Sequence, residues 1–313
     1  MSKILEFSDT TTLPALYGAH NAHLRHLEGV FGVEITSKSN QLILSGNKGD
    51  ISACEVILRA LEARVTNGDE VGIADIDAEV RFMKDKDAKG SGKKTSIKTK
   101  KKTIEARSPN QNTYLNLIKD KEMVFGLGPA GTGKTYLAVA MGVSMFLNGD
   151  VERLIFTRPA VEAGENLGFL PGDLKEKVDP YLRPIYDAMQ DMMPWDFVVK
   201  KMEAGEIEVA PLAFMRGRTL SNAFVILDEA QNTTATQMKM FLTRMGEASR
   251  MVITGDISQT DLPRGVKSGL RDAYETLNGI DDIGFMQFKT ADVVRHKLVG
   301  KIIQAYDARK PSH

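Results

Sequence analysis

Residues 123–135 read MVFGLGPAGTGKT, an apolar run that passes directly into a glycine-rich loop. The loop matches the pattern G-x-x-x-x-G-K-[ST] at every fixed position, and the helix-like run 136–141 follows it. Its residues are Gly128, Pro129, Ala130, Gly131, Thr132, Gly133, Lys134 and Thr135. A complete motif between a strand and a helix predicts a Walker A phosphate-binding loop. A glycine-rich turn with a chance lysine would explain only part of the pattern.

The chemistry of this loop comes from its backbone and from two side chains. Glycines allow the chain to wrap around a phosphate, so that successive N–H groups and the start of the helix point at the anion. We expect Lys134 to contact the β- and γ-phosphates of a nucleotide and the Thr135 hydroxyl to bind Mg²⁺. The stretch therefore predicts a nucleoside triphosphate and Mg²⁺ as ligands.

Two acidic residues end a second apolar run, residues 224–229 with the sequence FVILDE. Ligands bind at the carboxyl ends of strands in open parallel sheets, which is where these two carboxylates would lie. We expect Asp228 to hold Mg²⁺, largely through water, and Glu229 to orient and deprotonate the attacking water. A helix N-cap is the other interpretation of Asp228, and the complete loop upstream makes it the weaker one.

A third apolar run ends in polar residues, in the stretch 251–259 with the sequence MVITGDISQ. If the strand ends are aligned, these side chains lie beside the same pocket, and Gln259 is a candidate sensor of the γ-phosphate. A Gly-Asp pair after a strand is also common in turns. Both interpretations of this stretch stay open.

The spacing of these runs predicts the fold class of the larger part of the chain. Apolar runs of four or five residues, at 123–127, 153–157, 224–227 and 251–254, alternate with longer helical patterns. Continuous apolar strands separated by helices are what a parallel sheet covered on both faces requires. We therefore expect a doubly wound α/β domain with a mostly parallel sheet over residues 108–313.

Two segments precede that domain. Residues 1–82 read as a small α+β domain, with helices expected at 19–31 and 50–66 and strands at 33–37 and 41–45. Residues 83–107 carry ten basic and three acidic side chains, a charge of plus seven. Such a segment, with few large apolar residues, predicts a linker or an extended hairpin. Its lysines favour polyanion binding, although a solvated linker is the commoner use of a charge run.

The whole composition excludes several classes of protein. The 41 basic and 41 acidic residues cancel, so any attraction to nucleic acid depends on local clustering of charge. The single cysteine, Cys54, lies among apolar residues and is expected to be buried, and one cysteine forms no disulfide within the chain. No uncharged run reaches the length of about 18 residues that a membrane span needs. We expect a cytoplasmic protein.

The three motifs together resemble the PhoH-like family of P-loop ATPases, and the likeness spans nearly the whole chain. Other stretches that match the family are 157–160, 168–172, 228–232 and 255–263. The resemblance implies a RecA-like P-loop NTPase domain similar to the first motor domain of superfamily-one helicases, with ATP as the nucleotide. It also implies that Asn110 and Gln111 form an adenine-reading motif with Tyr114 near the base, and that Arg295 reaches the γ-phosphate. A solvated helix position is the alternative for Arg295.

One departure from those helicases affects the expected assembly. They place ATP between two motor domains of one chain, whereas here too few residues follow the last helix for a second motor domain. The other side of the pocket is then expected from another subunit of a homo-oligomer, such as a ring, which donates an arginine. The candidates for that arginine are Arg158, Arg183, Arg216, Arg218 and Arg264.

The N-terminal domain resembles a KH-type RNA-binding module at Gly18, Ala19, His20 and Asn21 and in the helix that follows. The fourth position of the KH loop is a glycine in the family, so Asn21 weakens the expectation of direct RNA contact. The sequence thus predicts an ATPase that acts on RNA, as a helicase or in RNA processing or ribosome maturation. A nucleotide-dependent assembly factor controlled by a partner protein is the alternative. A small-molecule kinase is disfavoured, because a water-activating Glu229 favours hydrolysis.

Overall fold

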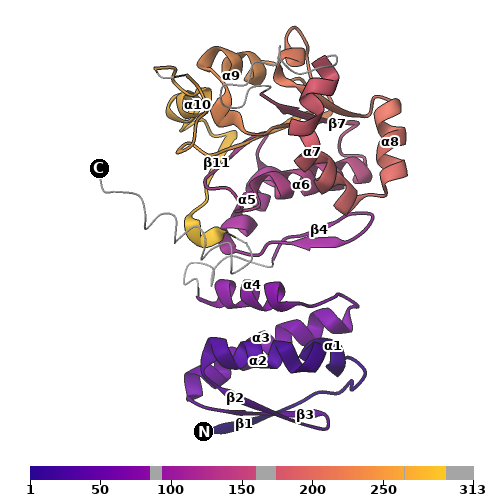
Figure 1. Cartoon of the computed structure of the whole chain (residues 1–313), viewed down its shortest axis with the longest axis vertical. Coiled ribbons are helices and arrows are strands. Elements are labelled where there is room, and N and C mark those ends of the chain that lie inside the picture. Colours follow the sequence, from indigo (N-terminus) through magenta and orange to yellow (C-terminus); the bar gives the residue numbers. More distant parts are fainter. Residues whose placement is uncertain (85–93, 160–173, 264, 294–313) are drawn as a thin grey trace. The chain divides into compact units, whose positions relative to one another are not determined.

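The computed structural model describes residues 1–84, 94–159, 174–263 and 265–293, with only the backbone given for 174–181. The chain divides into two compact units (Figure 1). One comprises residues 1–93 with 107–109, and the other comprises residues 94–106 with 110–313. Part of the lysine-rich segment therefore belongs to the second unit, as a hairpin.

The first unit is a three-stranded antiparallel sheet in the order β1-β3-β2, with four α-helices. Its elements are β1 (Ser2–Glu6), α1 (Leu13–Tyr17), α2 (Ala22–Phe31), β2 (Glu34–Lys38), β3 (Gln41–Ser45), α3 (Lys48–Thr66) and α4 (Ile73–Lys84). The expected strand 41–45 is confirmed. The expected helix 19–31 is shorter, because residues Ala19–Asn21 form a 3₁₀ turn in which His20 and Asn21 have positive φ angles of 51° and 57°.

The core of the first unit lies between the sheet and the helices. Leu42 and Leu44 on the central strand β3 have no exposed surface, and Leu27 of α2 packs in the same cluster. Cys54 of α3 is fully buried there, which confirms the expectation from its apolar neighbours. Burial and the nearby Glu28 carboxylate raise the pKa of the Cys54 thiol to about 12.

The second unit has a six-stranded parallel sheet in the order β11-β6-β10-β9-β7-β8. Its strands are β6 (Met123–Leu127), β7 (Arg153–Arg158), β8 (Ile207–Pro211), β9 (Ala223–Leu227), β10 (Arg250–Gly255) and β11 (Ile283–Gln287). The four strands expected from apolar runs are all present and lie together in the centre of the sheet. Strand β10 lies between β6 and β9, so the ends of the three motif-bearing strands are neighbours.

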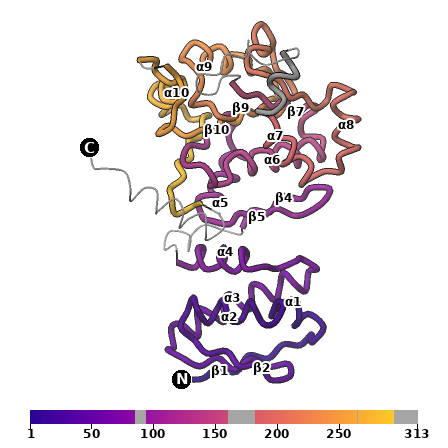
Figure 2. Tube along the Cα trace, viewed as in Figure 1, coloured from indigo at the N-terminus to yellow at the C-terminus, as the bar shows by residue number. Residues whose placement is uncertain are grey.

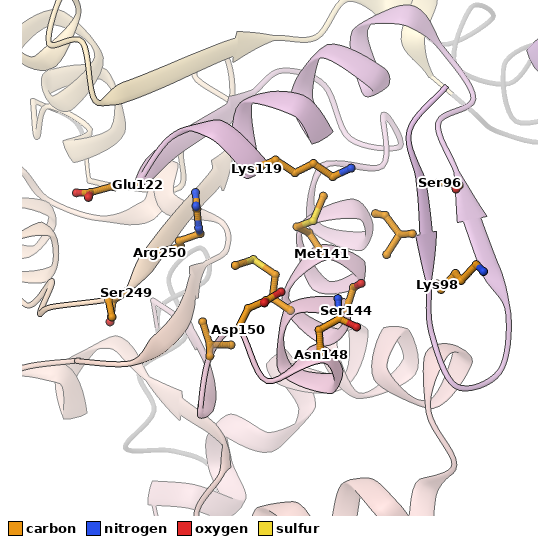
Figure 3. Close-up of a pocket in the computed structure, with 14 residues that line it drawn as sticks. Ser96, Lys98, Lys119, Glu122, Met141, Ser144, Asn148, Asp150, Ser249 and Arg250 are labelled. Carbon is orange, nitrogen blue, oxygen red and sulfur yellow. The ribbon is translucent and has the colours of Figure 1, made fainter. Parts of the chain in front are cut away.

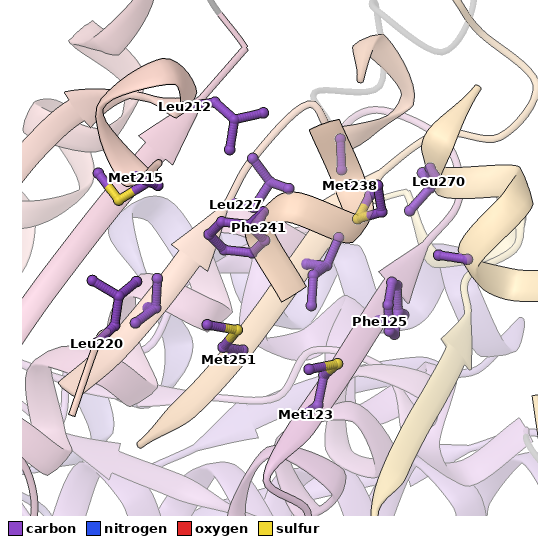
Figure 4. Packing of buried hydrophobic residues seen from close by; sticks show 14 of the residues in the cluster. Met123, Phe125, Leu212, Met215, Leu220, Leu227, Met238, Phe241, Met251 and Leu270 are labelled. Atoms are coloured by element: carbon purple, nitrogen blue, oxygen red, sulfur yellow. The ribbon is translucent and has the colours of Figure 1, made fainter. Parts of the chain in front are cut away.

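Helices cover both faces of this sheet, which confirms the doubly wound α/β class. Helix α6 (Lys134–Asn148) packs against β7, β9 and β10. Helices α9 (Ala235–Leu242) and α10 (Gly269–Leu277) contribute to a buried cluster with the other face, which includes Phe125, Leu227 and Met251 (Figure 4). Because helices cover both faces of the sheet, all five residues of β6 and of β9 are buried. This burial explains why these strands appear in the sequence as continuous apolar runs.

Strands β4 (Ser96–Lys98) and β5 (Thr103–Glu105) form an antiparallel hairpin. Both strands are labelled in Figure 2, close to helix α5 (Pro109–Asp120). The hairpin tip contacts the end of α7 (Leu174–Met192) and the start of α8 (Trp195–Glu203). Lys102 pairs with Asp191, and Lys101 Nζ donates to the Gln190 carbonyl at 2.6 Å. Lys100 Nζ lies 3.5 Å from the centroid of the Phe197 ring. Among the described residues, no helix has the length and apolar character to cross a membrane.

Candidate nucleotide-binding site

The loop after β6 has the backbone conformation that its glycines permit. Gly128, Gly131 and Gly133 have φ angles of 137°, 84° and 84°, which side chains other than glycine rarely adopt. A Cβ at Gly128 would lie 2.6 Å from the carbonyl oxygen of Phe288. The loop is therefore a close-fitting backbone cradle, and its shape fits a phosphate group held by N–H donors.

Lys134 begins helix α6 and turns its ammonium group back over the loop. Its Nζ donates to the carbonyl oxygens of Gly128 at 2.6 Å and Pro129 at 2.8 Å, and the residue is only 9% exposed. A buried ammonium group beside a cradle of N–H donors concentrates positive charge at one point. The loop and Lys134 together fit a polyphosphate.

A hydroxyl–carboxylate pair lies next to the loop. Thr135 Oγ1 donates to Asp228 Oδ1 at 2.7 Å, and Thr254 Oγ1 donates to the same oxygen at 2.6 Å. Asp228 is 5% exposed, and the described residues hold no group of three or more His, Cys, Asp and Glu side chains that could bind a metal by themselves. One hydroxyl and one carboxylate fit Mg²⁺, because this ion keeps several waters and is usually held by one or two protein oxygens plus substrate phosphates.

Glu229 follows Asp228 in a left-handed backbone conformation, with φ at 51°. Its Oε1 lies 3.5 Å from Arg158 Nη2, and its Oε2 accepts a hydrogen bond from Gln231 Nε2. Gln231 also accepts from the backbone N–H of Asp256 at 3.1 Å through its own Oε1. Two side chains therefore determine the direction in which the Glu229 carboxylate points.

A cavity of about 250 Å³ joins the residues of the three motifs. It is lined by Ala130, Gly131, Gly133, Lys134, Thr135, Tyr136, Asp228, Glu229, Gln231, Gly255, Asp256 and Gln259. A neighbouring cavity of about 570 Å³ shares Thr135, Tyr136, Asp228 and Glu229 with it. Gln259 thus lies in the same pocket as the phosphate loop, while its backbone N–H donates to Asp256 O at 3.1 Å in a turn. The two interpretations of this stretch are compatible.

Gln111 and Tyr114 of α5 lie beneath the phosphate loop. The Gln111 side-chain amide donates to the Thr132 carbonyl at 2.9 Å, and Gln111 is 3% exposed. Tyr114 is fully buried, and its ring meets the edge of Phe288 at a centroid distance of 5.3 Å. Burial raises the pKa of the Tyr114 hydroxyl, and the Asp228 carboxylate adds to the effect. In this geometry Gln111 supports the loop and Tyr114 fills the core below it.

The candidate arginines fall into different settings. Arg218 forms a bidentate ion pair with Glu208, in which Nη1 donates to Oε1 at 2.6 Å and Nη2 donates to Oε2 at 2.7 Å. The Arg158 guanidinium faces Glu229 of its own chain. Arg183 and Arg216 are exposed. Arg295, Arg264 and the stretch 168–172 lie outside the residues that the structure describes.

Sequence reasoning missed three contacts of this site: those of Thr254 with Asp228, Gln231 with Glu229, and Arg158 with Glu229. The residue types were visible at the ends of the apolar runs. Their partners depend on strand order, because Thr157 is paired with Leu227 and Thr254 follows Ile253, whose partner is also Leu227. Knowing that β7 and β10 flank β9 would have been sufficient to predict two of the three contacts.

A larger cavity, of about 780 Å³, lies at the amino ends of the strands (Figure 3). Lys98, Lys119 and Arg250 line it together with Glu122 and Asp150. Arg250 Nη1 is held by the carbonyl oxygens of Ile118 and Lys121, at 3.1 and 2.7 Å. The motif residues lie at the opposite, carboxyl ends of the strands. Cavity size alone therefore does not locate the nucleotide-binding site.

A glycine-rich loop, a buried lysine, and a threonine–aspartate pair at the carboxyl ends of a parallel sheet define a P-loop nucleoside triphosphatase fold of the RecA-like type. A family model described as "PhoH-like protein" matches residues 103–307. The chain therefore belongs to the PhoH-like protein family.

Similar proteins match over most of the chain. A PhoH-like protein of Bacillus subtilis (strain 168) is 48% identical over 297 residues, which are 94% of this chain and 93% of that protein. One from Mycobacterium tuberculosis (strain ATCC 25618 / H37Rv) is 47% identical over 299 residues, with 93% and 84% covered. Protein PhoH of Escherichia coli (strain K12) is 48% identical over 205 residues, with 65% and 58% covered. Among solved structures, the Pif1 helicase from Candida albicans aligns with a TM-score of 0.34 and 14% identity, covering 66% of this chain and 45% of that one.

Proposed function

We propose that the protein is a Mg²⁺-dependent ATPase of the cytoplasm that acts on RNA. The observation that carries the ATPase part is the contact of 2.7 Å between Thr135 and Asp228 beside the ammonium group of Lys134. The phosphate loop with Lys134 binds the triphosphate, and Thr135 and Asp228 hold Mg²⁺. When bound, Mg²⁺ neutralises charge on the phosphate oxygens. The contact of Gln111 with the loop supports a role for α5 on the adenine side of the nucleotide.

Glu229 is the residue that we assign to the water. Phosphoryl transfer depends mainly on positioning and charge stabilisation, so the carboxylate orients the attacking water in line with the γ-phosphate and accepts its proton. Gln259, in the same cavity, contacts the γ-phosphate and reports its presence. Arg295, which lies outside the described residues, would add positive charge there, as the family resemblance implies.

Lys134→Ala tests the ATPase proposal. We expect the variant to lose turnover of ATP by at least about 100-fold, because a preorganised charge on the transferred phosphate is removed. Lys239→Ala, on the exposed side of α9, is the matched control and should hydrolyse ATP normally. Steady-state phosphate release at saturating Mg²⁺ measures both. Ordinary activity of Lys134→Ala would end the proposal.

The action on RNA is supported by the first unit. Its order of elements, β1-α1-α2-β2-β3-α3, is followed by α4, and the turn at Gly18–Asn21 separates α1 from α2, as in the KH-like module that the sequence resembles. Asn21 adopts a left-handed conformation with φ at 57°, which asparagine tolerates better than most residues. This sequence therefore forms the turn with asparagine at its fourth position.

One observation favours the assembly factor as the second candidate. Lys100, Lys101 and Lys102 at the hairpin tip contact Phe197, the Gln190 carbonyl and Asp191. Lysines engaged within the protein release fewer counterions on RNA binding. Steady-state ATPase assays with single-stranded RNA at low and moderate salt separate the two candidates. Stimulation that fades with salt supports RNA action, whereas an unchanged rate supports control by a partner in RNA processing or ribosome maturation.

We also propose a homo-oligomer, such as a ring, in which a neighbouring subunit completes the nucleotide pocket. Arg183 and Arg216 are exposed on the second unit and are, among the described candidate arginines, the two most accessible to a neighbour. Light scattering at several protein concentrations, with and without nucleotide, measures the state of assembly. A monomer under all conditions with full ATPase activity would contradict the proposal.

A further inference from the structure

Arg158 and Glu229 form an ion pair inside the nucleotide site. Arg158 ends strand β7, and Glu229 follows the end of the neighbouring strand β9. Arg158 Nη2 lies 3.5 Å from Glu229 Oε1, and the Arg158 side chain is only 12% exposed. Both residues line the 570 Å³ cavity together with Thr135 and Asp228. The guanidinium is therefore a positive charge within the pocket of its own chain.

The Arg158–Glu229 pair is longer than an ordinary charge-assisted contact. A charge-assisted N–H···O contact is normally about 2.7–2.9 Å long, whereas Arg158 Nη2 lies 3.5 Å from Glu229 Oε1. A guanidinium has five N–H donors in a rigid fork that matches phosphate as well as carboxylate. A terminal phosphate carries more negative charge than a carboxylate, and Thr135 and Asp228, where we expect Mg²⁺, line the same cavity as Arg158.

We propose that Arg158 acts within its own chain as a positioning residue shared between Glu229 and the γ-phosphate of the nucleotide. Arg158 and Gln231 together orient the Glu229 carboxylate, and the γ-phosphate draws the Arg158 guanidinium toward itself. The Glu229 Oε1 atom is then released toward the attacking water. Nucleoside diphosphate, which has no γ-phosphate, leaves the pair in place. This inference rests on the proposed ATPase function and assigns how its site recognises the triphosphate.

Competition for one guanidinium has a measurable thermodynamic result. Glu229→Gln removes the competing charge and should bind the non-hydrolysable analogue AMP-PNP several-fold more tightly than the wild type. Arg158→Gln should bind AMP-PNP about tenfold more weakly, as expected when one charge-assisted contact to phosphate is lost. Both variants should keep wild-type affinity for ADP. In the double variant the gain from Glu229→Gln should disappear, because no guanidinium is left to release.

Isothermal titration calorimetry of the full chain with AMP-PNP and ADP, each with Mg²⁺, measures these affinities. Arg153→Gln is the matched control, since Arg153 begins the same strand and donates to the Ser221 carbonyl at 2.8 Å, at the opposite end from the pocket. An equal loss of ADP and AMP-PNP affinity in Arg158→Gln would assign Arg158 a structural role and overturn the proposal. So would independent effects in the double variant. Arg158→Lys keeps the charge and should recover part of the AMP-PNP affinity.

Mixing the two single variants tests whether the arginine acts within one chain. When Arg158→Gln and Glu229→Gln proteins are mixed and allowed to exchange subunits, we expect no recovery of ATP hydrolysis, because no chain holds both residues. Recovery would place Arg158 in the site of a neighbour and overturn the proposal.

Lys134→Ala separates the proposed ATPase function from the proposed role of Arg158. If it hydrolyses ATP normally, the proposed function fails; if it is inactive while Arg158→Gln behaves as wild type, only the role of Arg158 fails.

Discussion

Asp228 shows how single residues set up this site. Its carboxylate oxygen accepts from Thr135 on α6 and from Thr254 on β10, at 2.7 and 2.6 Å. Three elements thus meet at one buried charge. A buried carboxylate costs free energy unless it is hydrogen-bonded, so both hydroxyls stabilise Asp228 in the place where Mg²⁺ is expected.

Replacing Thr254 by Val removes one of these donors while nearly keeping the side-chain shape. Thr254 is fully buried, so we expect a loss of about 1–3 kcal/mol in the free energy of unfolding when its hydrogen bond to the buried carboxylate is removed. Thr243→Val, at an exposed position after α9, is the control and should change stability little. Urea denaturation followed by circular dichroism measures both. Equal stabilities of the two variants would show that water replaces the lost hydroxyl.

At the scale of elements, helix α3 packs one face into the core of the first unit. Ile51, Cys54, Leu58 and Leu61 on that face are all buried. Burial disfavours the thiolate form of cysteine, which raises the pKa of Cys54 to about 12. The thiol is consequently a packing group and a poor nucleophile in the folded protein.

This shift predicts a pH dependence of stability. An unfolded thiol ionises at a pKa of about 8.5, whereas the folded thiol keeps its proton up to about pH 12. The contribution of Cys54 to stability is therefore complete below about pH 8.5 and is lost progressively as pH rises toward 12. At pH 10 the loss should reach about 2 kcal/mol. In denaturation experiments from pH 7 to 10, the advantage of the wild type over Cys54→Ala should shrink; a constant difference would contradict the assignment.

At the scale of the whole molecule, two hydrophobic core clusters of the described residues, one in each unit, share no residue. One lies between β1-β3-β2 and the helices of the first unit, and the other lies on the large parallel sheet. All the motif residues described at the nucleotide site belong to the second unit. Ligand binding should therefore stabilise one unit directly.

Differential scanning calorimetry should resolve two unfolding transitions. AMP-PNP with Mg²⁺ at 100 times its Kd should stabilise the second unit by about 2.7 kcal/mol, because the ligand binds only its folded form. The transition of the first unit should stay in place, and Lys134→Ala should remove the shift. One cooperative transition that moves as a whole would show that the two units unfold together.

Much of the larger unit was predictable from its sequence. The strands 123–127, 224–227 and 251–254 are buried on both faces, so they appear as continuous apolar runs. Strands β8 and β11 did not stand out, because they are edge strands with intermediate burial at several positions. Strand β1 was missed for the same reason, since four of its five residues are exposed.

The sequence by itself determined the phosphate loop, the acidic pair after β9 and the doubly wound class, because these depend on local spacing and on periodic burial. Tertiary structure alone decided which side chains meet: Thr254 with Asp228, Arg158 with Glu229, and the hairpin lysines with α7 and α8. The physical reason is strand order. A parallel sheet brings together the ends of strands that are far apart in sequence, and nothing local in the chain specifies which strand becomes the neighbour of which.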